Sequence, residues 1–571
     1  MIRTRLSNAL RALTLVGTGL SLLGAPLAAQ EPEPIEAGVA PPFGRYAPGV
    51  DVLHYEVEIG LGYGTDWFAG RVDVHVAAED DGPVLPLDFT GLTLEEVAVD
   101  GHPARYDHVA GVLRVPLEAA EEGDRVIVTV VYRGVPDDGL ILRPNVHGAP
   151  SAFVDNWPNR TRFWLPSVDH PADKATVNYT VHAPAQWKVI ANGAQVGAPV
   201  SAADGAIGPD GERLTWRWEV GVPISPYNMV IGAADMTVQT VGLAACGQAP
   251  ASRRDDGCVE VTYWVFPQDV ERAEPSFRRA AEMVDYFTDL FGPFPFEKLA
   301  NVQSATRFGG MENASAIFYS EQAIASGRNI EGTVSHEIVH QWFGDAVTEE
   351  NWHHLWLSEG FATYFGDQFF EAADGEESFR RLMGESRQGV INSSDVERPI
   401  YDPAETSLFA LLNANNYPKG GWVLHMLRGI VGDDAFFTGI REYYGRYLHS
   451  VADTEDFQAV MEESSGDELD WFFSQWIYRP GFPTFDVQWR WIPGEGSTGT
   501  VEVTVRQIQR DSWPTFRVPT EIALEGPGGS SHHEIELLTR EEVIRIDGVK
   551  ARPSRVVLDP DGWVLKGDGG R

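Results

Sequence analysis

The chain has 571 residues, of which 43% are hydrophobic, so we expect several globular domains with sizeable cores. Its formal net charge of −39 makes nucleic acid and anionic membranes unfavourable partners. A solvated acidic surface accounts for this charge, which could also attract cationic peptides, although no acidic run concentrates it at one place.

The N-terminal residues are typical of a secretory signal. Residues 12–29 are apolar and rich in small side chains, and they follow basic residues at Arg3, Arg5 and Arg11. We expect a signal peptide over residues 1–29, cleaved near Ala28 or Ala29. An uncleaved membrane anchor is the alternative, but glycines and a proline make the run poor at spanning a bilayer. No later segment is apolar for long enough, so we expect an exported protein, periplasmic or secreted, with no stable membrane span after cleavage.

Strand-like segments follow a leader at residues 30–49. Apolar residues occupy every second position from Leu53 to Ile59, and Val126 to Tyr132 is a nearly continuous apolar run. Turn signals such as Asp80-Asp81-Gly82 separate these runs. The pattern predicts an N-terminal all-β domain over residues 50–265.

The chain contains two cysteines, Cys246 and Cys258. They flank a segment rich in glycine, arginine and aspartate between two strand-like runs. In an exported protein this spacing favours one disulfide that closes a hairpin loop. Two free thiols are the alternative.

The pattern becomes helical after residue 265. Val270 to Phe291 has apolar residues at helical spacing, and Gly292-Pro293 ends the helix. Further helices are predicted at residues 332–344, 358–372, 419–431, 433–447 and 454–464. Strands return after Pro480, so we expect a mixed α/β domain at 266–480 and a small C-terminal β-sandwich at 481–571. The predicted fold class is multidomain α+β.

The segment His336-Glu337-Ile338-Val339-His340 carries the clearest chemical signal. Residues i and i+4 share one face of a helix, so the two imidazoles can bind one zinc ion. Glu359 follows nineteen positions after His340, near the start of another predicted helix, and can supply a third ligand. Two histidines and one glutamate leave a position open for water or substrate, as in catalytic zinc sites. By itself the pentapeptide also fits a helix whose histidines simply pair with carboxylates.

Two flanking motifs accompany the zinc signal. Gly309-Gly310-Met311-Glu312-Asn313 precedes it, and Tyr417-Pro418-Lys419-Gly420-Gly421 follows it. Together with the zinc ligands, these motifs resemble those of the M1 family of zinc aminopeptidases, the gluzincins. The motifs cover about residues 305–425, and the layout on both sides is consistent over most of the chain. The resemblance implies a thermolysin-like catalytic domain at 266–480, one Zn²⁺ per chain, and peptide substrates with a free N-terminal amine.

The resemblance also implies roles for individual residues. Glu337 would be the general base that takes a proton from the attacking water. Tyr417 would stabilise the oxyanion, although an aromatic residue there also fits a packed helix. Glu312 would bind the substrate's α-amine. Around it, Gly309, Gly310, Met311 and Asn313 would let the peptide backbone lie along an edge strand.

Several positions depart from the family pattern. Asp345 and Ser358 stand where asparagine is usual, and His354 stands where aspartate is usual. His353 and His354 are adjacent and make a poor pair of metal ligands, because neighbouring helical residues point apart. The family's second amine anchor falls on Trp157 by counting, with Asp155 or Asn156 as alternatives.

Three other functions remain open at this point. An endopeptidase would use the same zinc chemistry without the amine anchor at Glu312. The second alternative is an epoxide hydrolase with aminopeptidase activity, because such enzymes carry a motif similar to Gly-Gly-Met-Glu-Asn. We see no room, however, for the further helical domain that such enzymes carry. A non-enzymatic binding protein on an inactive scaffold conflicts with the intact ligand set and Glu337.

Overall fold

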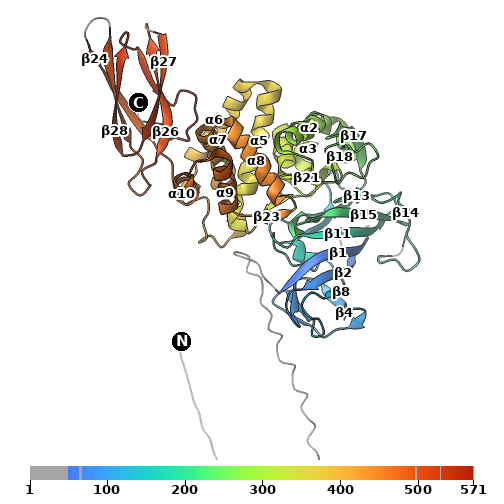
Figure 1. Ribbon diagram of the computed structural model, residues 1–571. Helices are drawn as coiled ribbons and strands as arrows, with labels where there is room; N and C mark the ends of the chain where they lie inside the picture. The colour runs from blue at the N-terminus through green and yellow to red at the C-terminus, as the bar shows by residue number, and fades with distance from the viewer. Residues whose placement is uncertain (1–48, 63–66, 210, 495–497, 528, 570–571) are drawn as a thin grey trace, which may run out of the picture. The chain divides into compact units, whose positions relative to one another are not determined.

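The fold comes from a computed structural model, which describes residues 49–62, 67–209, 211–494, 498–527 and 529–569. The expected signal peptide, and the leader apart from residue 49, lie outside the described residues. The predicted class is confirmed: strands come first, a sheet with helices follows, and strands return at the end (Figure 1).

A large sheet forms the core of the N-terminal region. Tyr55, Val57 and Ile59 of β1 are fully buried, as their alternation predicts, and Val57 lies opposite Val72 of β2. The sheet runs in the order β13-β15-β11-β1-β2-β8-β4-β5, with β14 paired to β15. Its strands are β1 (Val50–Leu61), β2 (Phe68–Ala78), β4 (Thr93–Val99), β5 (His102–Pro103), β8 (Arg125–Gly134), β11 (Ala175–Pro184), β13 (Ala194–Gln195), β14 (Val200–Ser201) and β15 (Arg213–Ile224).

Two smaller sheets complete this region. One has the order β12-β16-β10-β9, and the other has the order β3-β7-β6. Their strands are β3 (Val84–Asp88), β6 (Asp107–Val109), β7 (Val112–Pro116), β9 (Leu140–Pro144), β10 (Pro150–Val154), β12 (Lys188–Ala191) and β16 (Ile231–Ala234).

The next sheet carries one wall of the functional site. Its order is β17-β18-β19-β21-β20, and the two-residue edge strand β20 runs antiparallel to β21. The strands are β17 (Thr237–Ala244), β18 (Val259–Val265), β19 (Leu299–Ser304), β20 (Gly310–Met311) and β21 (Ala316–Ser320). The hydrogen bonds place β17 and β18 in this sheet. The domain boundary predicted between residues 265 and 266 had placed both strands in the N-terminal domain. Cys246 and Cys258 form the expected disulfide across the loop between β17 and β18.

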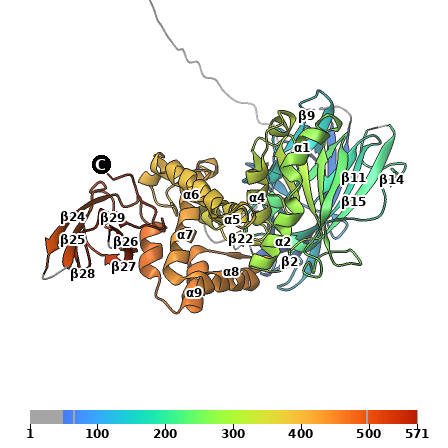
Figure 2. The same cartoon turned by 90° about the horizontal axis from the view of Figure 1, so that it is seen from above.

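Helices make up most of the region between this sheet and the C-terminal strands. α5 packs against both α4 and α7 (Figure 2). The helices are α1 (Val270–Phe277), α2 (Ala280–Phe291), α3 (Glu321–Ala325), α4 (Glu331–His340), α5 (Trp356–Asp374), α6 (Glu376–Ile391), α7 (Gly420–Val431), α8 (Asp433–Tyr447), α9 (Thr454–Ser465) and α10 (Asp470–Trp476). Short strands β22 (Val347–Glu349) and β23 (Ser450–Ala452) pair in parallel among them.

The C-terminal strands form two three-stranded sheets, β24-β25-β28 and β27-β26-β29. Val501, Val503 and Val505 of β25 and Ile522 and Leu524 of β26 are buried. This is the expected small sandwich. Its strands are β24 (Phe485–Pro493), β25 (Gly499–Gln507), β26 (Val518–Gly526), β27 (Gly529–Leu537), β28 (Glu541–Val549) and β29 (Arg555–Leu558).

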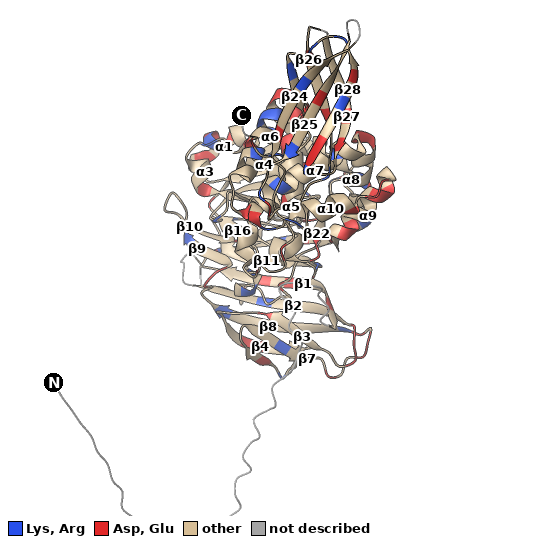
Figure 3. Ribbon diagram, turned by 90° about the vertical axis from the view of Figure 1, so that its left-hand side faces the viewer, with Lys and Arg blue, Asp and Glu red and all other residues tan. Residues whose placement is uncertain are grey.

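Acidic side chains are spread over many elements, including the helices and the sandwich strands, and basic ones are interspersed among them (Figure 3). This distribution fits the expectation that most of the negative charge is solvated surface. Within the described part of the chain, no helix is both long and apolar enough to cross a membrane.

Candidate metal centre

Helix α4 brings the two predicted histidine ligands to one point. His336 and His340 lie one turn apart, and their ring centroids are 4.8 Å apart. Their Nε2 atoms approach to 3.1 Å. Glu359 on α5 completes the group, with its Oε2 atom 3.1 Å from Nε2 of His336 and 3.3 Å from Nε2 of His340.

These separations fit a zinc ion. Ligand atoms about 2.0–2.1 Å from a tetrahedral zinc lie roughly 3.3 Å from one another. The three measured separations, 3.1, 3.1 and 3.3 Å, match this value. The donor set is two imidazoles and one carboxylate, which is a common catalytic set for zinc.

The orientation of His340 is set from its other ring nitrogen. Nδ1 lies 3.0 Å from the carbonyl oxygen of Phe343 and 3.0 Å from the hydroxyl of Ser358. A hydrogen bond from Nδ1 to the carbonyl leaves Nε2 free to bind a metal. Gly344 makes this packing possible, because a Cβ atom there would lie 2.5 Å from the Ser358 hydroxyl and 2.9 Å from Nδ1.

The buried ligands favour positive charge between them. Burial alone would raise the pKa of Glu359, but His340 and His336 hold it below its usual range. Burial alone would lower the pKa of His340, but Glu359 raises it well above its usual value. The same carboxylate that stabilises a proton here would stabilise a metal cation in its place.

Glu337 and Glu312 lie on the other side of His340. A carboxylate oxygen of each and a ring nitrogen of His340 lie within 4.8 Å of one another. Burial raises the pKa of both carboxyl groups, and the negative charge of nearby carboxylates also raises it. Gly310 lies directly against Glu337, since a Cβ atom at residue 310 would be 2.1 Å from the Glu337 carboxylate.

Tyr417 points its hydroxyl at Glu359. It lies on a single π-helical turn, Asn415–Lys419, immediately before α7. Its hydroxyl donates a 2.7 Å hydrogen bond to Oε1 of Glu359, and its ring stacks on that of His336 at a centroid distance of 6.0 Å. Tyr417 is therefore a residue of the site and not only a packed aromatic.

These residues open onto a cavity of about 400 Å³. Gly309, Gly310, Met311 and Glu312 form part of its wall, whereas Asn313 is buried outside the lining. The sequence did not indicate several other lining residues, which come from separate loops and helices: Phe308, Gly332, Thr333 and Leu412. Such a concave site with a few converging polar groups is typical of a small ligand or a peptide end.

Comparison with known families agrees with this geometry. Residues 276–476 match the family model for the peptidase family M1 domain. This segment includes every member of the ligand cluster, together with Glu312, Glu337 and Tyr417. The segment is an M1 peptidase domain.

Curated relatives and solved structures extend the similarity beyond this segment. The chain is 25% identical over 436 residues to "Probable aminopeptidase 1" of Sulfurisphaera tokodaii, covering 72% of this chain and 51% of that protein. It is 27% identical over 462 residues to "Tricorn protease-interacting factor F2" of Thermoplasma acidophilum, covering 77% and 54%. The chain thus spans about half the length of the curated relatives it matches. Its fold resembles that of an M1 zinc metallopeptidase from Deinococcus radiodurans, with a TM-score of 0.64 and 24% identity over 76% of this chain and 95% of that one.

Within the M1 domain, Asp345 has a structural partner that the sequence did not reveal. Its Oδ2 atom accepts a 2.8 Å hydrogen bond from Nε2 of Gln341, which also donates to the Glu312 carbonyl at 2.7 Å. Gln341 therefore links the backbone at Glu312 to the C-terminal end of α4. Glutamine at this position gives no sequence signal by itself, because its role depends on a contact with the backbone of residue 312, 29 positions away.

The N-terminal region contributes to the same turn of the M1 domain. Asn228 donates to Oδ1 of Asp345, Tyr227 donates to the Gly344 carbonyl at 3.1 Å, and Lys174 donates to the carbonyls of residues 345 and 346 at 2.9 and 2.8 Å. The turn that follows His340 is thus held by side chains of the N-terminal region.

Neither alternative for a second amine anchor is available. Thr306 and the guanidinium groups of Arg160 and Arg307 surround the buried carboxylate of Asp155. The Asn156 amide is fully used, donating to the carbonyls of residues 226 and 229 and accepting from Trp164. The counted position, Trp157, does line the cavity.

The histidine pair beside α5 is not part of the centre. Nδ1 of His354 lies 2.8 Å from the hydroxyl of Thr454, and Nε2 of His353 lies 3.1 Å from the Glu405 carbonyl. The two rings have different partners, in line with the expectation that they make a poor pair of ligands.

Proposed function

We propose that the protein is a zinc-dependent aminopeptidase that removes the N-terminal residue from peptides. The observation that carries the proposal is the convergence of His336, His340 and Glu359, with three ligand atoms 3.1–3.3 Å apart at the base of a cavity. The similarity to curated aminopeptidases supports the same activity. One zinc ion per chain would occupy this point.

Glu312 would select peptides with a free α-amine. It is buried in the cavity wall, with a carboxylate oxygen within 4.8 Å of Glu337 and His340, and no lysine or arginine among the described residues pairs with it. A protonated amine would form a charge-assisted hydrogen bond with this carboxylate, which would offset the free-energy cost of burying its charge. A mutant of the D. radiodurans metallopeptidase has been solved with a Tyr-Ser-Ala substrate, which has such an amine.

The side chains around the centre have distinct tasks. Zinc, when bound, would acidify a water molecule and polarise the scissile carbonyl. Glu337 would accept a proton from the attacking water and then deliver it to the leaving amine. The Tyr417 hydroxyl, which donates to Glu359 at rest, would be free to donate to the carbonyl oxygen as negative charge develops there.

A matched pair of peptides tests this proposal. We expect the protein to cleave Leu-Ala-Ala-amide and to leave its N-acetylated form intact, with activity lost on chelation and restored by Zn²⁺. Glu312→Ala should lower kcat/KM for the free peptide by about 10²-fold or more, because it removes a charge-assisted contact. Glu312→Gln keeps the shape and should lose nearly as much. Equal cleavage of both peptides by the unmodified protein would instead identify an endopeptidase.

We also propose that the protein is exported. The support is the basic and apolar pattern of residues 1–29, together with a disulfide between Cys246 and Cys258, since disulfides persist in oxidising compartments. Fractionation of the native host would test it: recovery of the protein only in the cytoplasm would contradict export.

A further inference from the structure

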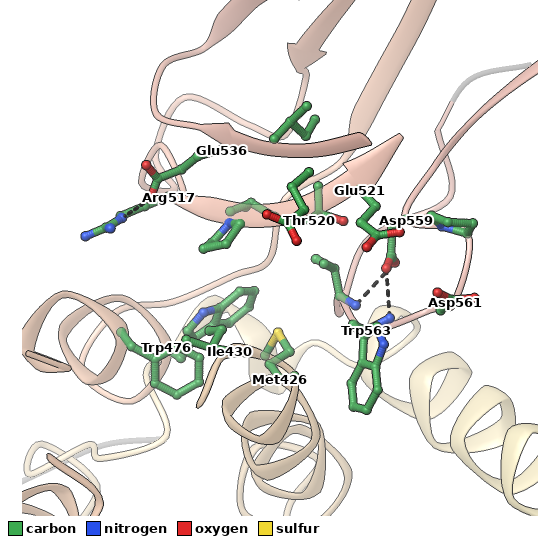
Figure 4. Close-up of a pocket in the computed structure, with 18 of the residues that line it drawn as sticks. Met426, Ile430, Trp476, Arg517, Thr520, Glu521, Glu536, Asp559, Asp561 and Trp563 are labelled. Carbon is green, nitrogen blue, oxygen red and sulfur yellow. Dashed lines mark hydrogen bonds and ion pairs between the residues drawn. The ribbon is translucent and has the colours of Figure 1, made fainter. Parts of the chain in front are cut away.

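A second cavity lies away from the metal centre, between the helices and the C-terminal sandwich. It has a volume of about 620 Å³, within the range of sites that bind small ligands or peptide segments. Its walls come from α7, α10, strands β26 and β27, and the segment that follows β29 (Figure 4). None of its lining residues belongs to the zinc cavity.

Hydrogen bonds and packing hold the two sides of this cavity together. The side chain of Gln475 on α10 donates to the backbone carbonyl of Arg517 at 2.9 Å and accepts from its N–H at 3.0 Å. On the opposite side, the Trp563 ring covers Gly429 of α7, where a Cβ atom would lie 2.8 Å from the ring. The cavity therefore has defined walls.

The floor of the cavity is apolar. Met426 and Ile430 of α7, Trp476 of α10 and Trp563 form one side of it (Figure 4). A cationic side chain with an apolar stem could bury the stem here while its charged end stays at the rim.

The rim of the cavity is acidic. It includes five carboxylates, of which Glu536 pairs with Arg517, Glu521 pairs with His532 and the buried Asp559 pairs with Lys566. Among the described residues, Glu534 and Asp561 have no ion-pair partner. Glu521 and Glu534 lie directly opposite each other on β26 and β27, an arrangement that is unfavourable for two like charges. His532, 2.8 Å from Glu521, offsets this repulsion only when it is protonated. The side chain of Glu534 has no hydrogen-bond or ion-pair partner among the described residues.

The protein's own Arg517 shows how this wall holds a guanidinium group. Its Nε atom donates to Glu536 at 2.6 Å, and its guanidinium carbon lies 4.2 Å from the centroid of the Trp471 ring. Carboxylate pairing combined with a contact on an aromatic face is a strong way to bind arginine. At the other end of the cavity, Trp563 lies near Asp561 and Glu521, and no arginine of the lining occupies that end (Figure 4).

We propose that this cavity is a binding site for a cationic peptide segment, in which an arginine side chain pairs with Glu534 and Asp561 and an apolar neighbour packs on Trp563 and Ile430. The site is separate from the metal centre, and the proposal does not depend on aminopeptidase activity. It would make part of the chain's large negative charge a recognition feature.

Calorimetric titration of the full-length, zinc-loaded protein tests the proposal. The probe is N-acetyl-Leu-Arg-amide, whose acetyl group removes the α-amine that Glu312 would bind, and the matched neutral probe is N-acetyl-Leu-Gln-amide. We expect saturable binding of one arginine peptide per chain. Binding of the glutamine peptide should be at least about fivefold weaker, and added salt should weaken the arginine peptide selectively.

Variants locate the binding. The double variant Glu534→Gln/Asp561→Asn should weaken the arginine peptide by about tenfold, because two partly exposed charge contacts are lost. The control Glu274→Gln/Glu282→Gln makes the same change in net charge on exposed residues of α1 and α2 and should leave binding within about twofold. Three results would overturn the proposal: no saturable binding up to about 10 mM, equal binding of both peptides, or undiminished binding in the Glu534→Gln/Asp561→Asn variant.

Discussion

Gly310→Ala should disable the metal centre without removing a single functional group. The new Cβ atom would lie 2.1 Å from a carboxylate oxygen of Glu337 and 2.5 Å from its carboxyl carbon. Ordinary contact needs about 3.4 Å, so the strand or the carboxylate must move by roughly 1 Å, and misplacement on that scale can cost about 10²-fold in rate. We therefore expect kcat/KM to fall by about 10²-fold, which corresponds to about 2.7 kcal/mol of transition-state stabilisation.

The assay is hydrolysis of an aminoacyl fluorogenic substrate, with zinc content measured in parallel. Zinc should stay near one per chain, because the atoms nearest to the new Cβ belong to Glu337 and not to a zinc ligand. Gly309→Ala is the comparison: its Cβ would meet nothing within 4 Å, so we expect at most about a threefold loss.

A double variant separates the two ways in which Gly310→Ala could act. If the loss comes from displacing Glu337, adding Gly310→Ala to Glu337→Gln should cost little more, because the base is already absent. If the methyl group instead blocks the peptide backbone, the two losses should multiply. A Gly310→Ala enzyme that keeps more than about a third of normal activity would refute the reasoning.

Three further predictions concern other side chains. Glu337→Gln should retain zinc and lose at least about 10²-fold in kcat, measured at saturating substrate; more than a tenth of normal activity would contradict its role as the base. Tyr417→Phe should lower kcat by about 10²-fold with little change in KM, and a change in KM alone would make it a binding residue. Burial, and then Glu385, raise the pKa of Asp367 to about 7, so folding favours its protonated form and stability is lost as pH rises from about 4 to 7. Asp367→Asn should therefore raise Tm at pH 8 and leave it nearly unchanged at pH 4, and equal shifts at both pH values would rule out this linkage.

The elements with strong local signals could be predicted from the sequence. The bounds of α8 were predicted to the residue, and Gly432 immediately before it marks its start. α9 begins at a capping box in which Asp453 and Asp456 bond each other's backbone. The meeting of His336 and His340 was predictable, because helical spacing places both side chains on one face of α4.

The features that were missed depend on contacts distant in sequence. α6 buries only Phe379, Met383 and Val390 along sixteen residues, so its apolar periodicity is weak. The boundary at 265/266 separated β18 from its parallel partner β19, a pairing that no local pattern reveals. Tertiary packing likewise decides two other features. These are the hydrogen bond from Gln341 to the Glu312 carbonyl and the pairing of Asp155 with arginines.

The turn after the zinc helix has a consequence for how this protein can be divided. Tyr227, Asn228 and Lys174 hold residues 344–346 from outside the segment 276–476 that matches the family model. The same segment also leaves out β17 and β18, which form one side of the sheet that ends in Gly310. The smallest piece that could fold into a working centre is therefore larger than the segment that matches the family model. A fragment cut at the borders of that segment would carry His336, His340 and Glu359 but lack the contacts that position them.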